Sequence, residues 1–172
     1  MPYRVVPLSP GPDTVVPADT VAFPVQVGRL RVLVVDDDAQ MRELIMVVLE
    51  LAGCEPAEAD GGDAALDYLR VNPPPDVVTT DLVMPGMSGL DFVRMLRSDP
   101  ARAELPVLVV SGNADGPEGA EAATLANGMI NKDAVVRDLM AAVREAIRTA
   151  PLSIAAARHD PIAAASAGPL AP

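Results

Sequence analysis

Two hydrophobic periodicities alternate along the middle of the chain. Short, uninterrupted apolar runs, such as RVLVV at 31–35, are typical of strands that are buried on both faces of a sheet. Between these runs, apolar residues recur every three or four positions, which indicates helices with one apolar face. The predicted strands cover residues 31–35, 54–59, 76–80, 105–110 and 128–131. The predicted helices cover 39–52, 61–71, 88–98 and 134–149, with a short, weak fourth helix within the Gly-interrupted segment 112–127.

Capping residues and helix breakers mark where several of these helices begin and end. Asp60 is the expected N-cap of the second helix, and Ser88 with Asp91 three residues later forms a capping-box pattern before the third. Gly53 and Pro151 are expected to end the first and the last helix. Five strands that alternate with five helices predict an α/β domain with a parallel sheet and helices on both faces. In such a sheet, ligands bind beyond the carboxyl ends of the strands.

The segments on either side of this unit differ from it in composition. Residues 1–29 carry prolines so spaced that neither a helix nor a central strand is expected, which predicts a Pro-rich disordered leader. Residues 151–172 are rich in Ala and Pro and poor in large apolar residues, which predicts a disordered tail. We therefore expect one domain over residues 30–150, without an output domain of its own.

Charge and hydropathy narrow the classes of function. The formal net charge is −11 and no cluster of Lys and Arg occurs, so direct binding to nucleic acid is not expected. No apolar run approaches the roughly 20 residues that a membrane-spanning helix needs, and the start of the chain lacks a signal-peptide pattern. These features predict a soluble, cytoplasmic protein. The single cysteine, Cys54, excludes an intramolecular disulfide and is expected to be a buried apolar residue.

Polar residues follow four of the five predicted strands. The first strand ends in the triplet DDD at 36–38, the third in Asp81, the fourth in Ser111 and the fifth in Lys132. Carboxylates held close together repel one another unless a cation intervenes, and Mg²⁺ accepts carboxylate oxygens while leaving room for phosphate. A carboxylate can also attack phosphorus to give an acyl phosphate, whose oxygens an ammonium and a hydroxyl would meet. The strand ends therefore predict a magnesium-dependent phosphoryl-transfer site.

The same residues carry a resemblance to a known family. The pattern VVDDD…VVTTDLVMPGMSGLD…LPVLVVSGN…INK is similar to the receiver domain of bacterial two-component response regulators. An Asp-Asp pair after a strand is common, but these pieces in this order, with D-x-x-M-P-G-M-S-G intact, are specific. The resemblance implies a flavodoxin-like doubly wound, five-stranded parallel sheet with strand order 2-1-3-4-5.

The resemblance also implies which residues accept the phosphoryl group and hold the metal. Asp81 is the expected phosphoacceptor. Mg²⁺ is the expected cofactor, bound directly by Asp37 and partly through water by Asp36. Asp81 itself and the backbone carbonyl of Val83, two residues further on, are expected to complete the protein ligands.

The remaining site residues match the family with two departures. Ser111 stands at the position of the Thr/Ser switch, and Lys132 at that of the lysine that pairs with the acceptor and then with the phosphate. The family usually has an aromatic residue three positions before this lysine, where this chain has Met129. It usually has proline directly after the lysine, where this chain has Asp133, which is expected instead to cap the last helix.

The function implied is that of a stand-alone receiver, a switch rather than an enzyme. A histidine kinase or a phosphotransfer protein is expected to phosphorylate Asp81. The change is expected to reach an unknown downstream protein through the fourth and fifth helices and the fifth strand. A monomer or weak homodimer is expected, with no contact to nucleic acid or membrane.

Two alternatives remain open from the residues alone. A haloacid-dehalogenase-type phosphatase also uses an aspartyl phosphate, Mg²⁺ and a lysine, and Asp36 with Asp38 superficially fits its D-x-D motif. The residue two positions later is Gln40 instead of Thr or Val, however, and Asp81 would have no role. The second alternative is a degenerate receiver that works by protein contact without phosphorylation, which Met129 and Asp133 favour.

Overall fold

Five strands and five helices alternate along residues 29–112 and 114–150, the part of the chain that the computed structural model describes. The strands are β1 (Arg31–Val35), β2 (Glu55–Ala59), β3 (Val77–Thr80), β4 (Val107–Ser111) and β5 (Gly128–Asn131). The helices are α1 (Ala39–Leu51), α2 (Gly62–Val71), α3 (Gly89–Ser98), α4 (Pro117–Leu125) and α5 (Val135–Thr149). A 3₁₀ turn at Lys132–Ala134 joins β5 to α5. Every predicted element is present, and only the ends are shifted by a few residues.

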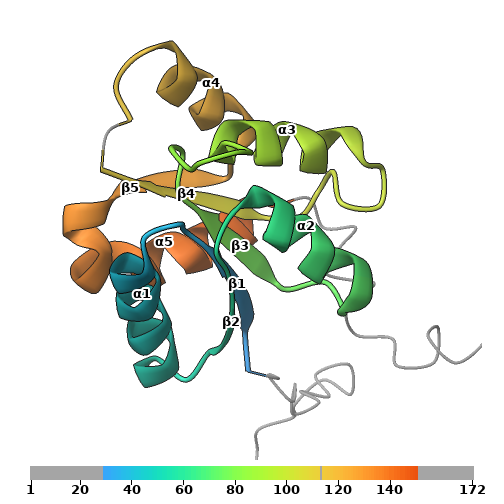
Figure 1. The fold of residues 1–172 in the computed structure, drawn as a ribbon. Helices are drawn as coiled ribbons and strands as arrows, with labels where there is room; N and C mark the ends of the chain where they lie inside the picture. Colours follow the sequence, from blue (N-terminus) through green and yellow to red (C-terminus); the bar gives the residue numbers. More distant parts are fainter. Residues whose placement is uncertain (1–28, 113, 151–172) are drawn as a thin grey trace, which may run out of the picture.

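The strands form one parallel sheet in the order β2-β1-β3-β4-β5, which confirms the predicted flavodoxin-like fold (Figure 1). Val35 of β1 lies beside Thr80 of β3, and the next residue along each strand is an aspartate. On the other side, Ser111 of β4 lies beside Asn131 of β5, directly before Lys132. The order and register of the strands therefore bring these polar residues to one edge of the sheet.

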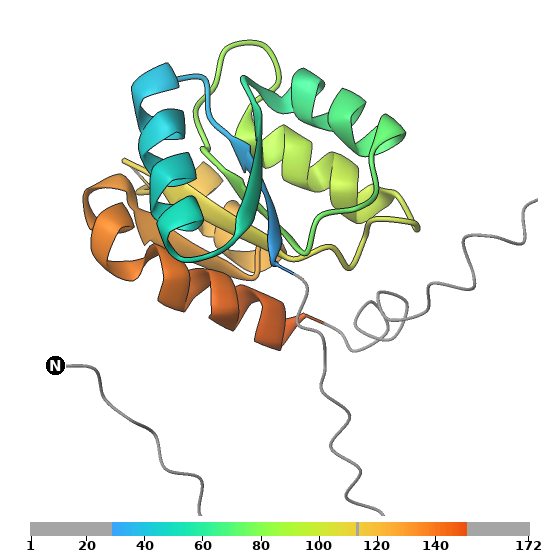
Figure 2. The ribbon, with the colours of Figure 1, turned by 90° about the horizontal axis from the view of Figure 1, so that it is seen from below.

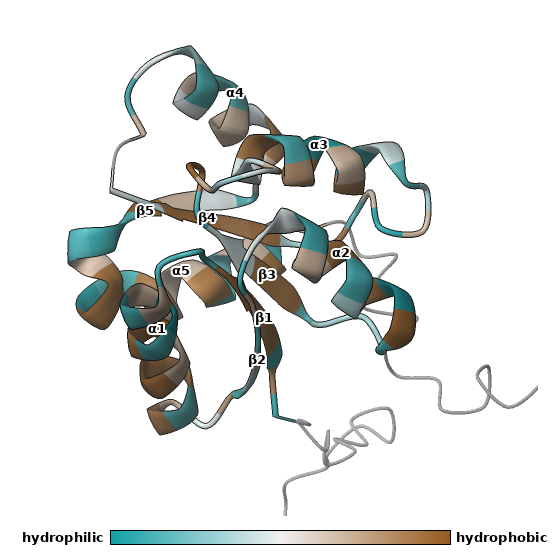
Figure 3. Ribbon diagram, viewed as in Figure 1, coloured by the Kyte–Doolittle hydropathy of each residue, from teal (hydrophilic) through white to brown (hydrophobic). Residues whose placement is uncertain are grey.

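Helices cover both faces of the sheet, as Figure 2 shows from below. On one face, α1 and α5 pack on apolar side chains of alternate strand positions, such as Val32 and Val34. On the other face, α2 and α3 pack on the residues between them, such as Leu33 and Val35. The inner strands β1 and β4 are mainly apolar in the hydropathy colouring, as expected for strands with two covered faces (Figure 3). Cys54 belongs to the core on the α1 side, as predicted.

One of the three capping predictions is confirmed at the start of its helix, and two are wrong. The Ser88 hydroxyl accepts a hydrogen bond from the Asp91 backbone amide, as the capping-box pattern predicts, and it also donates one to the Asp91 carboxylate. The prediction for Asp60 was wrong, because Gly61 is the N-cap of α2 and makes no side-chain capping bond. The prediction for Asp133 was also wrong, because this residue lies inside the 3₁₀ turn and α5 begins after Ala134.

The predicted leader and tail, at 1–29 and 151–172, lie outside the described residues except for Arg29. Among the helices that are described, none is long and apolar enough to cross a membrane.

A buried hydroxyl in β3 provides a test of the packing around the sheet. Within residues 29–112 and 114–150, Thr79 Oγ1 is buried without a hydrogen-bond partner. Because such a group loses its contact with water and gains nothing, Thr79→Val should raise the free energy of unfolding by about 1 kcal/mol. The neighbouring Thr80 is the matched control, since its hydroxyl donates to the Asp81 carbonyl at 2.9 Å. Thr80→Val should lower the same quantity in urea unfolding, and an equal gain from both variants would contradict the prediction.

Candidate functional site

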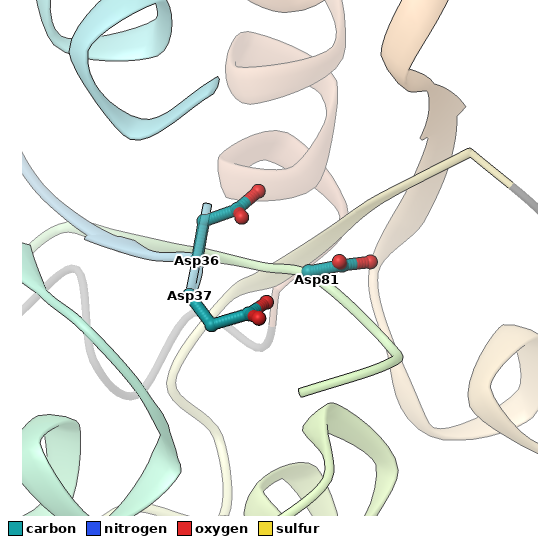
Figure 4. A group of neighbouring side chains, drawn as sticks. All are labelled: Asp36, Asp37 and Asp81. Atoms are coloured by element: carbon teal, nitrogen blue, oxygen red, sulfur yellow. The ribbon is translucent and has the colours of Figure 1, made fainter. Parts of the chain in front are cut away.

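Three carboxylates meet beyond the ends of β1 and β3. One oxygen from each of Asp36, Asp37 and Asp81 lies within 4.8 Å of the others. Figure 4 shows the three side chains side by side at the ends of the two neighbouring strands. Asp36 and Asp81 are buried, whereas Asp37 is exposed, so the cluster has one side open to solvent.

Lys132 pairs with the two buried carboxylates of this cluster. Its Nζ lies 2.8 Å from Asp81 Oδ2, as a hydrogen bond, and 2.8 Å from Asp36 Oδ2, as an ion pair without hydrogen-bond alignment. The side chain of Asp36 is only 1% exposed, so its charge depends on this neighbour. The predicted meeting of the acidic pair, the acceptor and the lysine is therefore found.

The electrostatics of the buried groups follow from their surroundings. Burial raises the pKa of the Asp36 carboxyl above its ordinary value, and the Asp81 charge acts in the same direction. The Lys132 ammonium and the Asp38 amide offset only part of this shift. Burial also disfavours the Lys132 ammonium, but the carboxylates of Asp36 and Asp81 outweigh it and raise the pKa of the lysine. The lysine is thus held in its charged form.

The turn after β3 fixes the position of Asp81. The Leu82 amide donates to Asp81 Oδ1 at 2.6 Å, and the Gly89 amide donates to the Leu82 carbonyl at 2.9 Å. Gly86 has a φ of +74°, a conformation that favours glycine. A Cβ atom on Gly89 would lie 1.7 Å from the Asp81 carbonyl oxygen, so only glycine allows the start of α3 to approach Asp81 this closely.

An arginine that the sequence analysis did not single out supports the acidic loop. Arg42 Nη1 donates to the Asp36 carbonyl oxygen at 2.7 Å, and Arg42 Nε contacts Glu58 at 2.8 Å. The Asp38 amide donates to Asp36 Oδ1, while the Asp38 carboxylate caps α1. The only signal in the sequence was a basic residue one turn into the first predicted helix.

The other predicted site residues lie around the cluster at different depths. Ser111 is buried at the end of β4, next to the strand that leads to Lys132. Val83, in the turn after Asp81, is exposed, with 67% of its surface accessible. Met129 packs against an apolar cluster that contains Leu82 and the α4 residue Ala122, so it takes a packing role.

The family described as "Response regulator receiver domain" matches residues 32–144 of this chain, which includes every strand end of the site. The chain belongs to the response regulator receiver family. The resemblance inferred from the motifs is therefore confirmed over the whole domain and not only at the motif residues. It favours the receiver over the haloacid-dehalogenase interpretation, which also left Asp81 without a role.

Known proteins that resemble this receiver agree in sequence and in fold. The phosphate regulon transcriptional regulatory protein PhoB of Klebsiella pneumoniae is 34% identical over 121 residues, which are 69% of this chain and 52% of PhoB. The chain thus spans about half the length of the curated relatives it matches. The crystal structure of a response regulator receiver protein from Pseudomonas putida has a TM-score of 0.64 and 34% identity, covering 69% of this chain and 98% of that one. The chemotaxis response regulator CheY4 of Vibrio cholerae has a TM-score of 0.58 and 26% identity, with coverages of 67% and 99%.

The close approach of Gly89 to Asp81 can be tested by adding a single methyl group. Gly89→Ala should lower the free energy of unfolding by about 3 kcal/mol, because the new atom overlaps a backbone oxygen that cannot move without displacing β3. Gly112→Ala is the control, since nothing lies within 4 Å of the added Cβ atom there. Its effect should be about 0.5 kcal/mol or less in the same denaturant titration. Similar losses from both variants would show that Gly89 is not sterically required.

Proposed function

We propose that this receiver is a phospho-accepting switch of a two-component system, with Asp81 as the phosphoacceptor and a histidine kinase or phosphotransfer protein as the donor. The observation that carries the proposal is the Lys132 ammonium, which lies 2.8 Å from both Asp36 and Asp81. A buried carboxylate held by one lysine, with a second acid alongside, is the arrangement that can accept a dianionic phosphoryl group. The proposed role is stoichiometric signalling instead of turnover of a substrate.

The cluster fits a hard divalent cation. Its three carboxylates face one ammonium, so negative charge is in excess, and every donor atom is an oxygen. Asp36, Asp37 and Asp81 would hold Mg²⁺ together with the backbone carbonyl of Val83, which follows Asp81 by two residues. When bound, Mg²⁺ would neutralise charge on the phosphoryl oxygens and on the carboxylates. The exposed side at Asp37 leaves room for water and for the incoming phosphate.

Each side chain of the site has a part in the proposed transfer. An Asp81 carboxylate oxygen forms a bond to phosphorus while the P–N bond of the donor phosphohistidine breaks. The bonding pair stays with the imidazole, which takes up a proton. Lys132, already beside Asp81 Oδ2, then pairs with the phosphoryl oxygens, and Ser111 at the neighbouring strand end donates its hydroxyl to them. The turn at Leu82–Gly89 keeps the acceptor in place throughout.

The proposed output is a protein contact. Phosphorylation would shift the receiver between two conformations, read on α4, β5 and α5. PhoB is named as a transcriptional regulatory protein and MtrA of Mycobacterium bovis as a DNA-binding response regulator. The net charge of −11 argues that this chain reaches its target through a protein partner and not through its own contact with DNA.

Metal binding can be tested with two neighbouring aspartates. Asp37→Asn should weaken Mg²⁺ binding by about tenfold or more in a calorimetric titration, because it removes a charged ligand from the cluster. Asp38→Asn removes the same charge one residue away, but Asp38 caps α1 and asparagine caps equally well. This control should change the affinity by about twofold, as expected for a screened charge outside the site. Equal losses from both variants would indicate diffuse attraction in place of ligation.

Phosphorylation can be tested on the full chain by mass spectrometry. Incubation with Mg²⁺ and acetyl phosphate should add the mass of one phosphoryl group, mapped to Asp81 and absent from Asp81→Asn. Asp63→Asn, an exposed acid in the first turn of α2, should still be modified and is the matched control. No adduct from acetyl phosphate or from a phosphorylated histidine kinase would favour the degenerate receiver, which acts by contact alone.

A further inference from the structure

Helix α4 has the smallest apolar anchorage among the helices of the described chain. Over Pro117–Leu125 its buried residues are only Gly119 and Ala122, whereas α5 buries Val135, Leu139, Val143 and Ala146. Its packing partner is α3, on which it lies in Figure 1. Because so little apolar surface is removed from water, polar contacts must contribute much of what holds α4 in place.

Arg97 of α3 provides those contacts at the C-terminal end of α4. Its Nε donates to the Leu125 carbonyl at 2.8 Å, and its Nη2 to Asn127 Oδ1 at 3.1 Å. Nη1 donates to the carbonyls of Ala103 and Leu105 at 3.0 and 2.9 Å. One half-buried guanidinium therefore joins α3 to the last turn of α4 and to the loop before β4.

Asn127 extends this connection into the sheet. Its side-chain oxygen also accepts a hydrogen bond from the Val107 backbone N–H at 3.0 Å, and the Asn127 backbone N–H donates to the Val107 carbonyl at 2.7 Å. The end of α4 is thus fixed to the first residue of β4 as well as to Arg97. Such bonds from a charged donor to partly buried carbonyls are costly to break, since the carbonyls would lose their partners.

The middle of α4 is held by a weaker contact. Arg94, one turn before Arg97, binds both carboxylate oxygens of Glu121 at 2.8 and 2.6 Å and also contacts Asp91 at 2.9 Å. The Arg94 and Glu121 side chains are 48% and 43% exposed, so salt screens their attraction. This ion pair can open without exposing buried groups.

The N-terminal end of α4 leads to the candidate site. It begins after Gly116, whose φ is +97° and which makes no side-chain capping bond. A short segment from there runs back to Ser111, at the end of β4. The two ends of α4 therefore differ: the C-terminal end is held by partly buried hydrogen bonds, and the N-terminal end is connected along the chain to the predicted switch residue.

We infer that Arg97 and Asn127 form a hinge that fixes the C-terminal end of α4, and that Arg94 with Glu121 is a salt-sensitive latch along its middle. Movement of α4 then pivots about Leu125–Asn127, and the latch sets how readily it occurs. The link from Ser111 to this movement rests on the proposed function. The hinge and the latch themselves do not rest on it, because their contacts are present without phosphorylation.

Hydrogen–deuterium exchange of the full chain tests the hinge. Arg97→Lys keeps the charge but not the planar set of donors, and should speed exchange of the α4 amides by about tenfold or more, as expected when a charged donor is lost from partly buried carbonyls. Arg97→Ala should do the same to a greater extent. Arg102→Lys is the matched control, since Arg102 donates to the Leu69 carbonyl of α2 and should leave α4 unchanged.

The latch is tested in the same experiment by salt. Arg94→Ala should speed α4 exchange by about twofold at low salt and have no effect in about 1 M salt, where the Debye length is about 3 Å. Unchanged α4 exchange in both Arg97 variants would overturn the inference, as would equal acceleration in α1, which would mean general destabilisation. Adding Mg²⁺ and beryllofluoride then separates the two proposals. A wild-type protein that does not respond would contradict the phosphorylation switch, while the hinge is judged by the exchange without ligand.

Discussion

The ion pairs of Lys132 with Asp36 and Asp81 are the interaction on which the rest of the site depends. Burying two carboxylates at the end of a sheet is unfavourable, and the raised pKa of Asp36 shows that burial is only partly offset. The Lys132 ammonium reduces the cost of burying the two carboxylates, but its single positive charge does not neutralise both of them. The excess negative charge that remains, together with the exposed Asp37, is the feature that would let the cluster hold the proposed cation and receive the proposed phosphoryl group from the solvent side.

The sheet provides the rigidity that this charge arrangement requires. Val35 and Thr80 are paired in register, so the aspartates that follow them are neighbours wherever the two strands pair. Strand β3 is buried along its whole length, and the turn after it is held by the Leu82 and Gly89 amides. Electrostatic stabilisation of a developing charge depends on groups that are already in position, and a fully covered parallel strand supplies this.

Rigidity is not distributed evenly around the site. Helices α1 and α5 are anchored on one continuous apolar core, while α4 offers little more than Ala122 and Leu125 to its own small cluster. Its position consequently depends on directional hydrogen bonds from Arg97 and on an exposed ion pair of Arg94. Elements held this way open at lower free-energy cost than elements held by a large buried surface. The strand ends that carry Asp36 and Asp81 are thus firmly held, whereas α4, one of the elements proposed to carry the output, is held less firmly.

The sequence by itself determined the alternation of strands and helices, the parallel sheet and the polar residues at its carboxyl edge. These features can be predicted from local periodicity and from the position of residues such as Asp81 and Lys132 directly after apolar runs. The Ser88 cap was likewise predictable, because its signal is local. Only the tertiary structure decided that Asp60 and Asp133 cap no helix, since loop geometry sets which residue faces the free amides. It also decided the roles of Arg42 and Arg97, because the carbonyl groups that they contact belong to other segments of the folded chain. The Thr79 hydroxyl, which has no partner among the described residues, likewise became apparent only in the packed sheet.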